Sequence, residues 1–138
     1  NLNHSIEWFF LIIKHMKIIK TNKAPAAIGP YSAGIKINNM IFTSGQIPVN
    51  PVDGSMPSDI KEQTRQSLNN VKGILAEEGY SLNDVVKTTV FIMDMNDFAA
   101  INEVYAEMFG DHKPARSCVQ VAKLPKGAGI EIEVIACK

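Results

Sequence analysis

The sequence has few cysteines and only scattered histidines. Cys118 and Cys137 are the two thiols among 138 residues, and they form no CxxC pair. A disulfide framework is therefore not expected, and a reducing, cytoplasmic setting is the simpler interpretation. The histidines stand at positions 4, 15 and 112, and no spacing of His, Cys or carboxylates predicts a metal site.

An excess of charge of either sign is also missing. The 14 Lys and Arg balance 14 Asp and Glu. This balance argues against a broad surface for nucleic acid or anionic lipid, although it is compatible with a local positive pocket. No GxGxxG, Walker or GxSxG motif occurs, so nucleotide binding and serine hydrolysis have no motif to support them.

The first 15 residues differ from the rest of the chain. Their apolar run, Trp8 to Ile13, is too short to span a bilayer and lacks the flanks of a signal peptide. Ordinary globular sequence begins at Met16. We therefore predict that residues 1–15 are upstream sequence or a remnant of cloning, and that residues 16–138 form one domain. The alternative is an amphipathic extension that docks on the body.

Strand and helix signals alternate along the domain. Runs of alternating polarity predict strands, and apolar residues at intervals of three and four predict helices. The expected segments are strands at 16–21, on either side of Asn38-Asn39 within 32–45, at 85–93, 115–124 and 129–137, and helices at about 60–79 and 96–110. The order β-β-β-α-β-α-β-β predicts an α+β fold with two helices on one face of the sheet.

The first helix has recognisable ends and a buried stripe. Asp59 precedes Glu62 by three residues, which is the spacing of a capping box, and Gly79 is a natural stop. The apolar stripes expected on the two helices are Ile60, Thr64, Leu68, Val71 and Leu75, then Phe98, Ile101, Tyr105 and Met108.

The strand at 85–93 has apolar residues on both faces. Alternation places Val86, Val90 and Ile92 on one face and Val85, Phe91 and Met93 on the other. Two helices cover only one face of such a sheet. A partner subunit is therefore expected to cover the second face, because large bare apolar patches are unusual on monomers.

Arg116 is the strongest candidate for a binding residue. Alternation places it with Cys118 and Gln120 on one face of its strand. A guanidinium presents a rigid fork of donors that matches a carboxylate at two points. The alternative is a structural ion pair with Glu131 or Glu133, and residue type alone does not separate the two interpretations.

Two glutamates share the polar face of the last strand. Ile130, Ile132 and Val134 alternate with Glu131 and Glu133. A carboxylate beside a bound electrophile can orient or deprotonate a water molecule. The alternative is a solvated face, which is less favoured here if the last two strands form a hairpin that carries Arg116 nearby.

Cys118 can be read as a nucleophile or as a small buried thiol. His112 is close in sequence, but no third residue is identifiable that would orient it. The buried thiol is the favoured interpretation.

Four further residues are weaker candidates for the lining of a pocket. Gly45, after Ser44, permits close approach of a ligand to the backbone, but the pair also suits a simple turn. Tyr31 is either a core aromatic or a pocket wall. Asn102 lies among apolar neighbours on its helix, where facing solvent is the alternative.

Five longer blocks of the chain are distinctive: APAAIGPYSAG, FTSGQIPVNP, RQSLNNVKGIL, VVKTTVFIMDMNDFAAIN and PARSCVQVAKLPKGAGIEIEVIA. In this order they resemble the Rid (YjgF) family, and most closely its RidA branch of 2-iminobutanoate/2-iminopropanoate deaminases. The resemblance implies a chorismate-mutase-like fold and a homotrimer whose sheets form a central barrel. It also implies active sites between subunits that hydrolyse 2-imino acids to 2-oxo acids and ammonia without a cofactor.

The resemblance also implies roles for single residues. Arg116 would hold the substrate carboxylate, and Glu131 would position the attacking water. The pocket would further be lined by Tyr31, Ser44, Gly45, Asn102 and Cys118. One departure is that the segment MFGDHKPARS is short, with Lys113 where the family usually has an aromatic residue. That departure leaves the preference for the substrate side chain open.

Two other functions stay as alternatives. One is a regulatory module that binds 2-oxo acids without turnover, which would not need Glu131. The other, associated with some family members, is RNA cleavage or inhibition of translation. The balanced charge and the lack of a basic surface with interleaved aromatics make RNA the weaker alternative.

Overall fold

The computed structural model describes residues 2–7 and 15–138, so the apolar run expected at 8–13 lies outside the described residues. Residues 2–7 are helical. The domain contains β1 (Met16–Ile19), β2 (Gly34–Ile37), β3 (Met40–Thr43), α2 (Ile60–Ala76), β4 (Val85–Ile92), α3 (Phe98–Phe109), β5 (Ala115–Gln120) and β6 (Ile130–Cys137). The predicted order β-β-β-α-β-α-β-β is confirmed.

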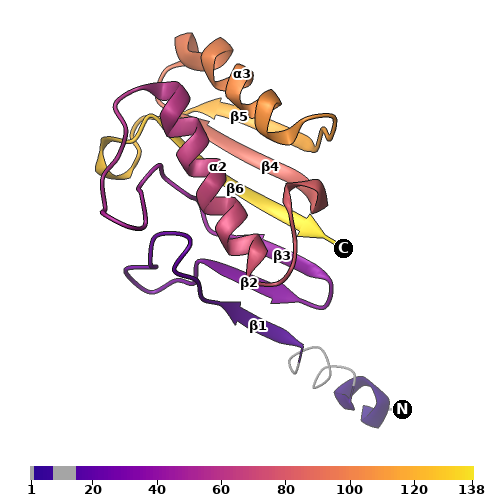
Figure 1. Ribbon diagram of the computed structural model, residues 1–138. Helices are drawn as coiled ribbons and strands as arrows, with labels where there is room; N and C mark the ends of the chain where they lie inside the picture. Colours follow the sequence, from indigo (N-terminus) through magenta and orange to yellow (C-terminus); the bar gives the residue numbers. More distant parts are fainter. Residues whose placement is uncertain (1, 8–14) are drawn as a thin grey trace.

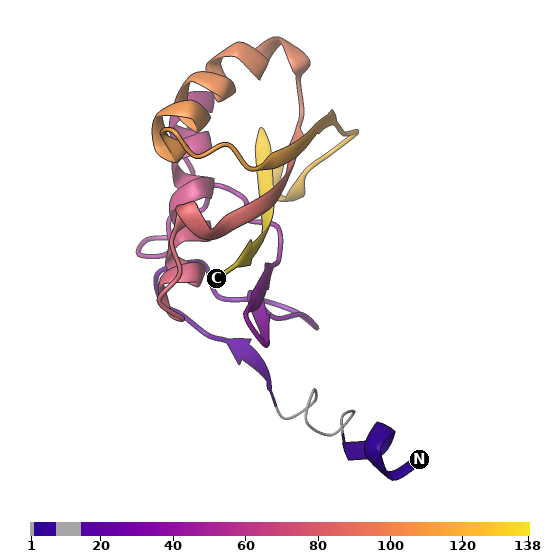
Figure 2. The same cartoon turned by 90° about the vertical axis from the view of Figure 1, so that its right-hand side faces the viewer.

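The strands form one mixed sheet of six, in the order β1-β2-β3-β6-β4-β5. Neighbouring strands are antiparallel except β4 and β5, which run parallel. Both helices cover the same face, as the prediction required (Figures 1 and 2). The opposite face has no covering element among the described residues (Figure 2).

The expected hairpin between the last two strands is wrong. β4 lies between β5 and β6 and pairs with both. The reason is that α3 carries the chain back over the sheet, so that β5 returns beside β4 in the parallel sense of a crossover connection. β6 then occupies the central position between β3 and β4, where its alternate residues Ile130, Ile132 and Val134 are buried.

The two valines at the start of β4 lie on the opposite faces from those expected. The pairing of β4 with β6 shifts register between Val85 and Lys87. This β-bulge inserts one extra residue and reverses the alternation at that point. Val85 is therefore fully buried with Val90 and Ile92, whereas Val86 is 47% exposed.

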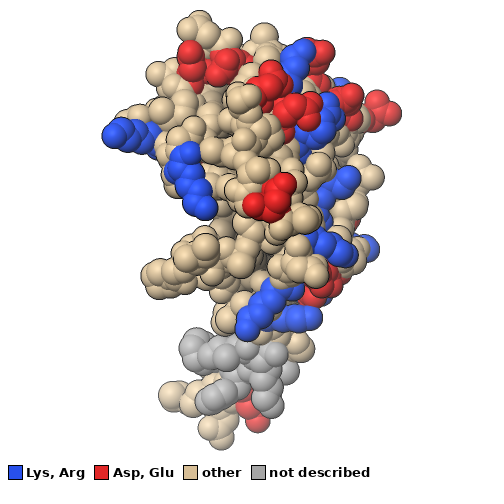
Figure 3. Space-filling view, turned by 60° about the vertical axis from the view of Figure 1, so that its left-hand side comes forward, with Lys and Arg blue, Asp and Glu red and all other residues tan. Residues whose placement is uncertain are grey.

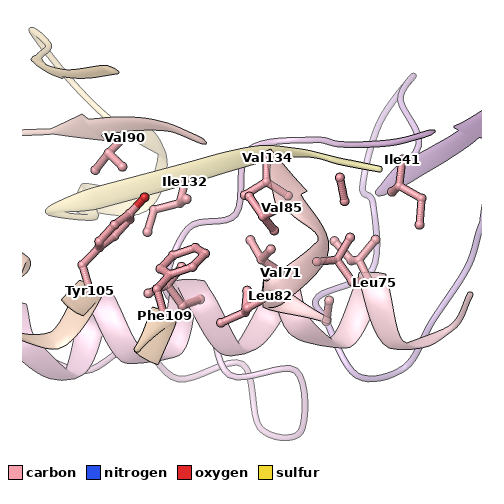
Figure 4. Close-up of a cluster of buried hydrophobic side chains, with 14 of the residues drawn as sticks. Ile41, Val71, Leu75, Leu82, Val85, Val90, Tyr105, Phe109, Ile132 and Val134 are labelled. Atoms are coloured by element: carbon pink, nitrogen blue, oxygen red, sulfur yellow. The ribbon is translucent and has the colours of Figure 1, made fainter. Parts of the chain in front are cut away.

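The core lies between the sheet and the helices. Figure 4 shows Val71 and Leu75 of α2 and Tyr105 and Phe109 of α3 packed beneath strand residues. The predicted stripe of α2 is confirmed, with Thr64, Leu68, Val71 and Leu75 fully buried and Ile60 partly buried. Asp59 caps the helix by accepting a hydrogen bond from the amide of Glu62.

Buried amides on α2 hold two loops. Asn70 Nδ2 donates to the carbonyl oxygens of Ile47 at 3.1 Å and Val49 at 2.9 Å. Gln63 donates to the carbonyl of Pro57 at 2.8 Å and accepts from the amide of Gly129 at 2.9 Å. The helix therefore fixes segments that lie far away in the sequence.

Charged side chains are interspersed on the surface. Ion pairs join the helices, from Lys61 to Glu103 at 2.7 Å and from Arg65 to Glu107 at 2.9 Å. The face in Figure 3 shows basic and acidic groups mixed, without a field of one sign. No helix in the described part of the chain is long and apolar enough to cross a membrane.

The face opposite the helices is apolar in part. Ile18, Phe42 and Val119 project from it and are 50%, 41% and 47% exposed. Ile18 and Phe42 belong to one row across β1, β2 and β3, because both pair with Ile35. This exposed row supports the expectation that a partner subunit covers the face.

We predict that Asn70→Ala lowers the free energy of unfolding by about 1–3 kcal/mol, because it leaves two carbonyls without their donor. Asn69→Ala is the matched control, since Asn69 is exposed on the same helix. Urea unfolding of both variants measures the difference. Equal stability of the two variants would show that the buried amide contributes nothing.

Candidate functional site

Arg116 lies on the face of β5 that the helices cover. Its Nη1 donates to Asn102 Oδ1 at 2.7 Å. The guanidinium carbon lies 4.8 Å from the ring centre of Tyr105 and 5.5 Å from that of Phe98. Asn102 therefore orients the guanidinium and does not merely face solvent. The amide accepts from one nitrogen, which leaves the rest of the fork for a ligand.

A hollow of about 440 Å³ opens beside this guanidinium. Its lining includes Asn102, Tyr105, Phe109 and Arg116. It therefore combines aromatic walls with a fixed cation, which is an arrangement suited to a small organic anion.

Glu131 lies on the opposite face of the sheet from Arg116. In the register of β4, Arg116 pairs with Thr88, whereas Glu131 pairs with Phe91. Thr88 and Phe91 are three positions apart, and because successive residues of a strand point to opposite faces, these two lie on different faces. The two candidate catalytic residues do not meet within one chain, and the alternative of an ion pair between them is wrong for this chain.

Glu131 lines a second hollow, of about 610 Å³, together with Tyr31 and Gly45. The carboxylate lies directly against Gly45, because a Cβ added there would be 2.6 Å from Glu131 Oε1. Any larger residue at position 45 would displace the carboxylate. The sequence predicted that a ligand approaches the backbone at this glycine; within the chain, the Glu131 side chain lies there.

Ser44 has a supporting position. Its hydroxyl donates to the carbonyl of Ser32 at 2.6 Å, and its amide donates to that of Ala33 at 2.8 Å. These bonds attach the end of β3 to the segment that carries Tyr31. Ser44 is not among the residues that line the hollow of Glu131, so the structure places it behind that wall.

The environment of Glu131 favours its protonated form. Burial raises the pKa of the Glu131 carboxyl above 4.5, and the neighbouring charge of Glu133 raises it further. Both effects disfavour the anion. A carboxylate whose pKa is raised is a stronger base toward a water molecule than an ordinary glutamate.

Cys118 is a partly buried thiol packed against the core. Burial raises its pKa, and the opposing effect of Arg116 is smaller. His112 is engaged elsewhere, since its Nε2 lies 2.6 Å from the carbonyl of Val85. A carbonyl only accepts, so this nitrogen carries the proton. These contacts support the interpretation of Cys118 as an unactivated thiol.

Two residues of the site were not singled out from the sequence. Tyr105 was expected only as part of a buried stripe, yet its ring also supports Arg116. Lys126 lines the hollow of Glu131 and has a left-handed backbone, with φ of 57°. The stretch PKGA, residues 125–128, predicted only a tight loop there. In the described part of the chain, no cluster of His, Cys, Asp and Glu suits a metal ion.

Comparison with known proteins identifies a family that most of the chain matches. Residues 21–138 match the family described as Endoribonuclease L-PSP. The chain is 56% identical over 125 residues to the 2-iminobutanoate/2-iminopropanoate deaminase of Escherichia coli K12, an alignment that covers 88% of this chain and 98% of that protein.

Solved structures show the same fold. The crystal structure of E. coli TdcF with bound serine matches with a TM-score of 0.86 and 55% identity, over 88% of this chain and 98% of that one. The crystal structure of the YjgF gene product of E. coli also has a TM-score of 0.86 and 55% identity, with the same coverage.

We predict that the Glu131 carboxyl titrates above 4.5 in the folded protein, and that Glu133→Gln lowers its pKa by removing a like charge. Carbon-detected NMR titration of the glutamate carboxyls measures both values. The burial contribution should persist in Glu133→Gln. A wild-type pKa at or below 4.5 would contradict the assignment.

The raised pKa of Glu131 also makes the stability of the fold depend on pH. Because the folded-state pKa is raised, the contribution of this group to stability is present below the unfolded-state pKa and is lost as the pH rises through the folded value. Glu131→Gln should therefore unfold at a higher temperature than the wild type at neutral pH.

Proposed function

The chain belongs to the Endoribonuclease L-PSP family, and we propose that it hydrolyses 2-imino acids, such as 2-iminobutanoate and 2-iminopropanoate, to 2-oxo acids and ammonia. The 56% identity to a protein named for this deaminase activity supports the proposal. The resemblance to the Rid family that the sequence blocks carry is confirmed. Free Cys118 and Cys137 are compatible with a reducing cytoplasm.

The observation that supports the proposal is that the two candidate catalytic residues lie on opposite faces of the sheet. One face of the sheet holds an oriented guanidinium, and the other holds a carboxyl with a raised pKa. We propose that a homotrimer brings Arg116 of one subunit beside Glu131 of the next. The exposed row of Ile18 and Phe42 supports burial of the open face in that assembly.

Arg116 would bind the substrate carboxylate. Two parallel N–H···O bonds from its fork would fix the plane of the carboxylate, and with it the position of the imine carbon. Asn102 and Tyr105 would keep the fork in place before the substrate arrives. Such preorganisation holds the imine carbon where a water molecule can approach it at a defined angle.

Glu131 would orient the attacking water. The water oxygen adds to the carbon of the protonated imine while one proton of the water passes to the carboxylate, which gives a carbinolamine. The carboxyl then returns this proton to the amino nitrogen. As the C–N bond breaks, the carboxylate takes the hydroxyl proton, the carbonyl of the 2-oxo acid forms and ammonia leaves. Water supplies the oxygen and no electrons are gained or lost, so the reaction needs no redox cofactor.

The alternative is a module that binds 2-oxo acids at Arg116 without turnover. Removal of Glu131 distinguishes the two, because carboxylate binding does not use it. The description of the family also names endoribonucleases. The mixed charges of the surface in Figure 3 do not favour RNA as the ligand.

We predict that Arg116 and Glu131 have separable roles. Arg116→Ala should weaken 2-oxobutanoate binding by roughly tenfold or more and abolish acceleration, because hydrogen bonds to charged groups are worth about 1.5–3 kcal/mol. Arg116→Lys should be nearly as poor. Glu131→Gln should keep binding and slow hydrolysis. Calorimetric titration and a threonine dehydratase assay that follows 2-oxobutanoate release measure the two effects. Full acceleration by Glu131→Gln would favour the binding module.

We also predict that the two defective chains complement each other. In trimers formed from equal amounts of Arg116→Ala and Glu131→Gln chains, about a quarter of the sites would combine an intact Arg116 with an intact Glu131. The mixture, assembled by co-expression, should regain about that share of wild-type acceleration. A site within one chain would regain none. Light scattering on the wild type should show a trimer.

We propose finally that residues 1–15 lie outside the domain. The family match begins at residue 21 and extends to residue 138. A chain that starts at Met16 should therefore keep its assembly and its imine hydrolysis. Loss of either property would show that the segment is part of the folded unit.

A further inference from the structure

The hollow beside Arg116 contains a second cationic side chain. Lys113 lines the same hollow of about 440 Å³ and precedes Arg116 by three residues. Among the residues that the structure describes, no aspartate or glutamate lines it. Asp111, the nearest carboxylate in the sequence, is exposed and lies outside the lining. A chain of balanced charge therefore places two positive groups and no negative group around one small space.

Neither cation is neutralised within the described residues. The ion pairs of this region use other basic residues, such as Lys61 and Arg65 on α2. Arg116 instead has a neutral amide partner in Asn102. Two like charges that share a hollow repel each other, and a ligand with two negative groups relieves that repulsion better than a ligand with one.

The hollow is built by fixed elements. Tyr105 and Phe109 on α3 supply its apolar wall and are 9% and 5% exposed. The segment that carries Lys113 is attached to the sheet, because His112 Nε2 donates to the carbonyl of Val85 at 2.6 Å. Lys113 therefore lies in a segment that is fixed at both ends, by this hydrogen bond and by the start of β5.

We infer that the site prefers 2-imino acids that carry a second carboxylate on the side chain, such as 2-iminosuccinate and 2-iminoglutarate. Arg116 binds the carboxylate next to the imine carbon, and Lys113 binds the distal one. The inference rests on the proposed imine hydrolysis and adds the substrate class. The wall of Tyr105 and Phe109 contacts the methylene groups between the two carboxylates.

The chemistry of lysine determines how strictly the site selects ligands with a distal carboxylate. An ammonium is a compact point charge on a flexible stem, so it accepts a distal carboxylate at more than one distance from the imine carbon. Lys113 is exposed and stays hydrated when the ligand has an apolar side chain. A monocarboxylate is therefore accepted, and the second carboxylate adds affinity.

The test compares two product analogues of similar length, 2-oxoglutarate and 2-oxopentanoate, by calorimetric titration of the full chain. We expect 2-oxoglutarate to bind roughly tenfold more tightly at low salt, with the ratio falling as salt screens the distal pair. Lys113→Met should reduce the ratio to about one, and Lys113→Arg should retain most of it. Lys123→Met is the matched control, since Lys123 is exposed and lies outside the hollow.

Equal binding of the two analogues by the wild type would overturn the inference, as would a ratio that Lys113→Met leaves unchanged. These results are independent of the proposed function, which is measured on the wild type as acceleration of 2-iminobutanoate hydrolysis. If that hydrolysis is accelerated without a dicarboxylate preference, only the substrate class is wrong. If the wild type prefers 2-oxoglutarate but does not accelerate the hydrolysis of 2-iminobutanoate, the protein is a dicarboxylate-binding module and the hydrolytic proposal fails.

Discussion

The alternation of side chains along β-strands is the constraint on which the candidate site depends. β4 pairs with both β5 and β6, so its residues define a common register for Arg116 and Glu131. The register places them on opposite faces of one sheet, and no rotamer change can bring a side chain through it. A reaction that needs both residues must therefore use two copies of the chain. The open face, with its row of exposed apolar side chains, is the surface on which a second copy would pack.

Each half of the site is held by contacts made within its own chain. On one face, the amide of Asn102 and the ring of Tyr105 fix the guanidinium from two directions. On the other face, Gly45 leaves room for the Glu131 carboxylate, and the buried Asn70 of α2 holds the adjoining loop by the carbonyls of Ile47 and Val49. Helix α2 thus supports the wall of the Glu131 hollow, because Ile47 and Val49 line it. The proposed assembly would therefore join two halves that each chain already holds in place.

Local patterns predicted those parts of the molecule that depend on neighbours in the sequence. The N-cap at Asp59, the buried stripe of α2 and the strand–turn–strand around Asn38 all follow from interactions over a few residues. Strand order does not, because the sequence of the last two strands suits a hairpin as well as two positions separated by β4. The bulge at Val85 also escaped prediction, since one inserted residue leaves the apolar pattern unchanged while it reverses the faces. The contact of Arg116 with Asn102 joins two elements whose packing no local signal describes.

Within a single chain, the charges of the two candidate catalytic residues do not compensate each other. Arg116 has a neutral hydrogen-bond partner, and its positive charge has no counter-ion among residues 2–7 and 15–138. Glu131 is partly buried beside Glu133, and both circumstances raise its pKa. An ion pair between Arg116 and Glu131 would remove both costs, and it would also lower the pKa of the carboxyl and occupy the fork. The sheet prevents that pairing within the chain. The guanidinium therefore remains available for the carboxylate of the proposed substrate, and the pKa of the Glu131 carboxyl stays raised.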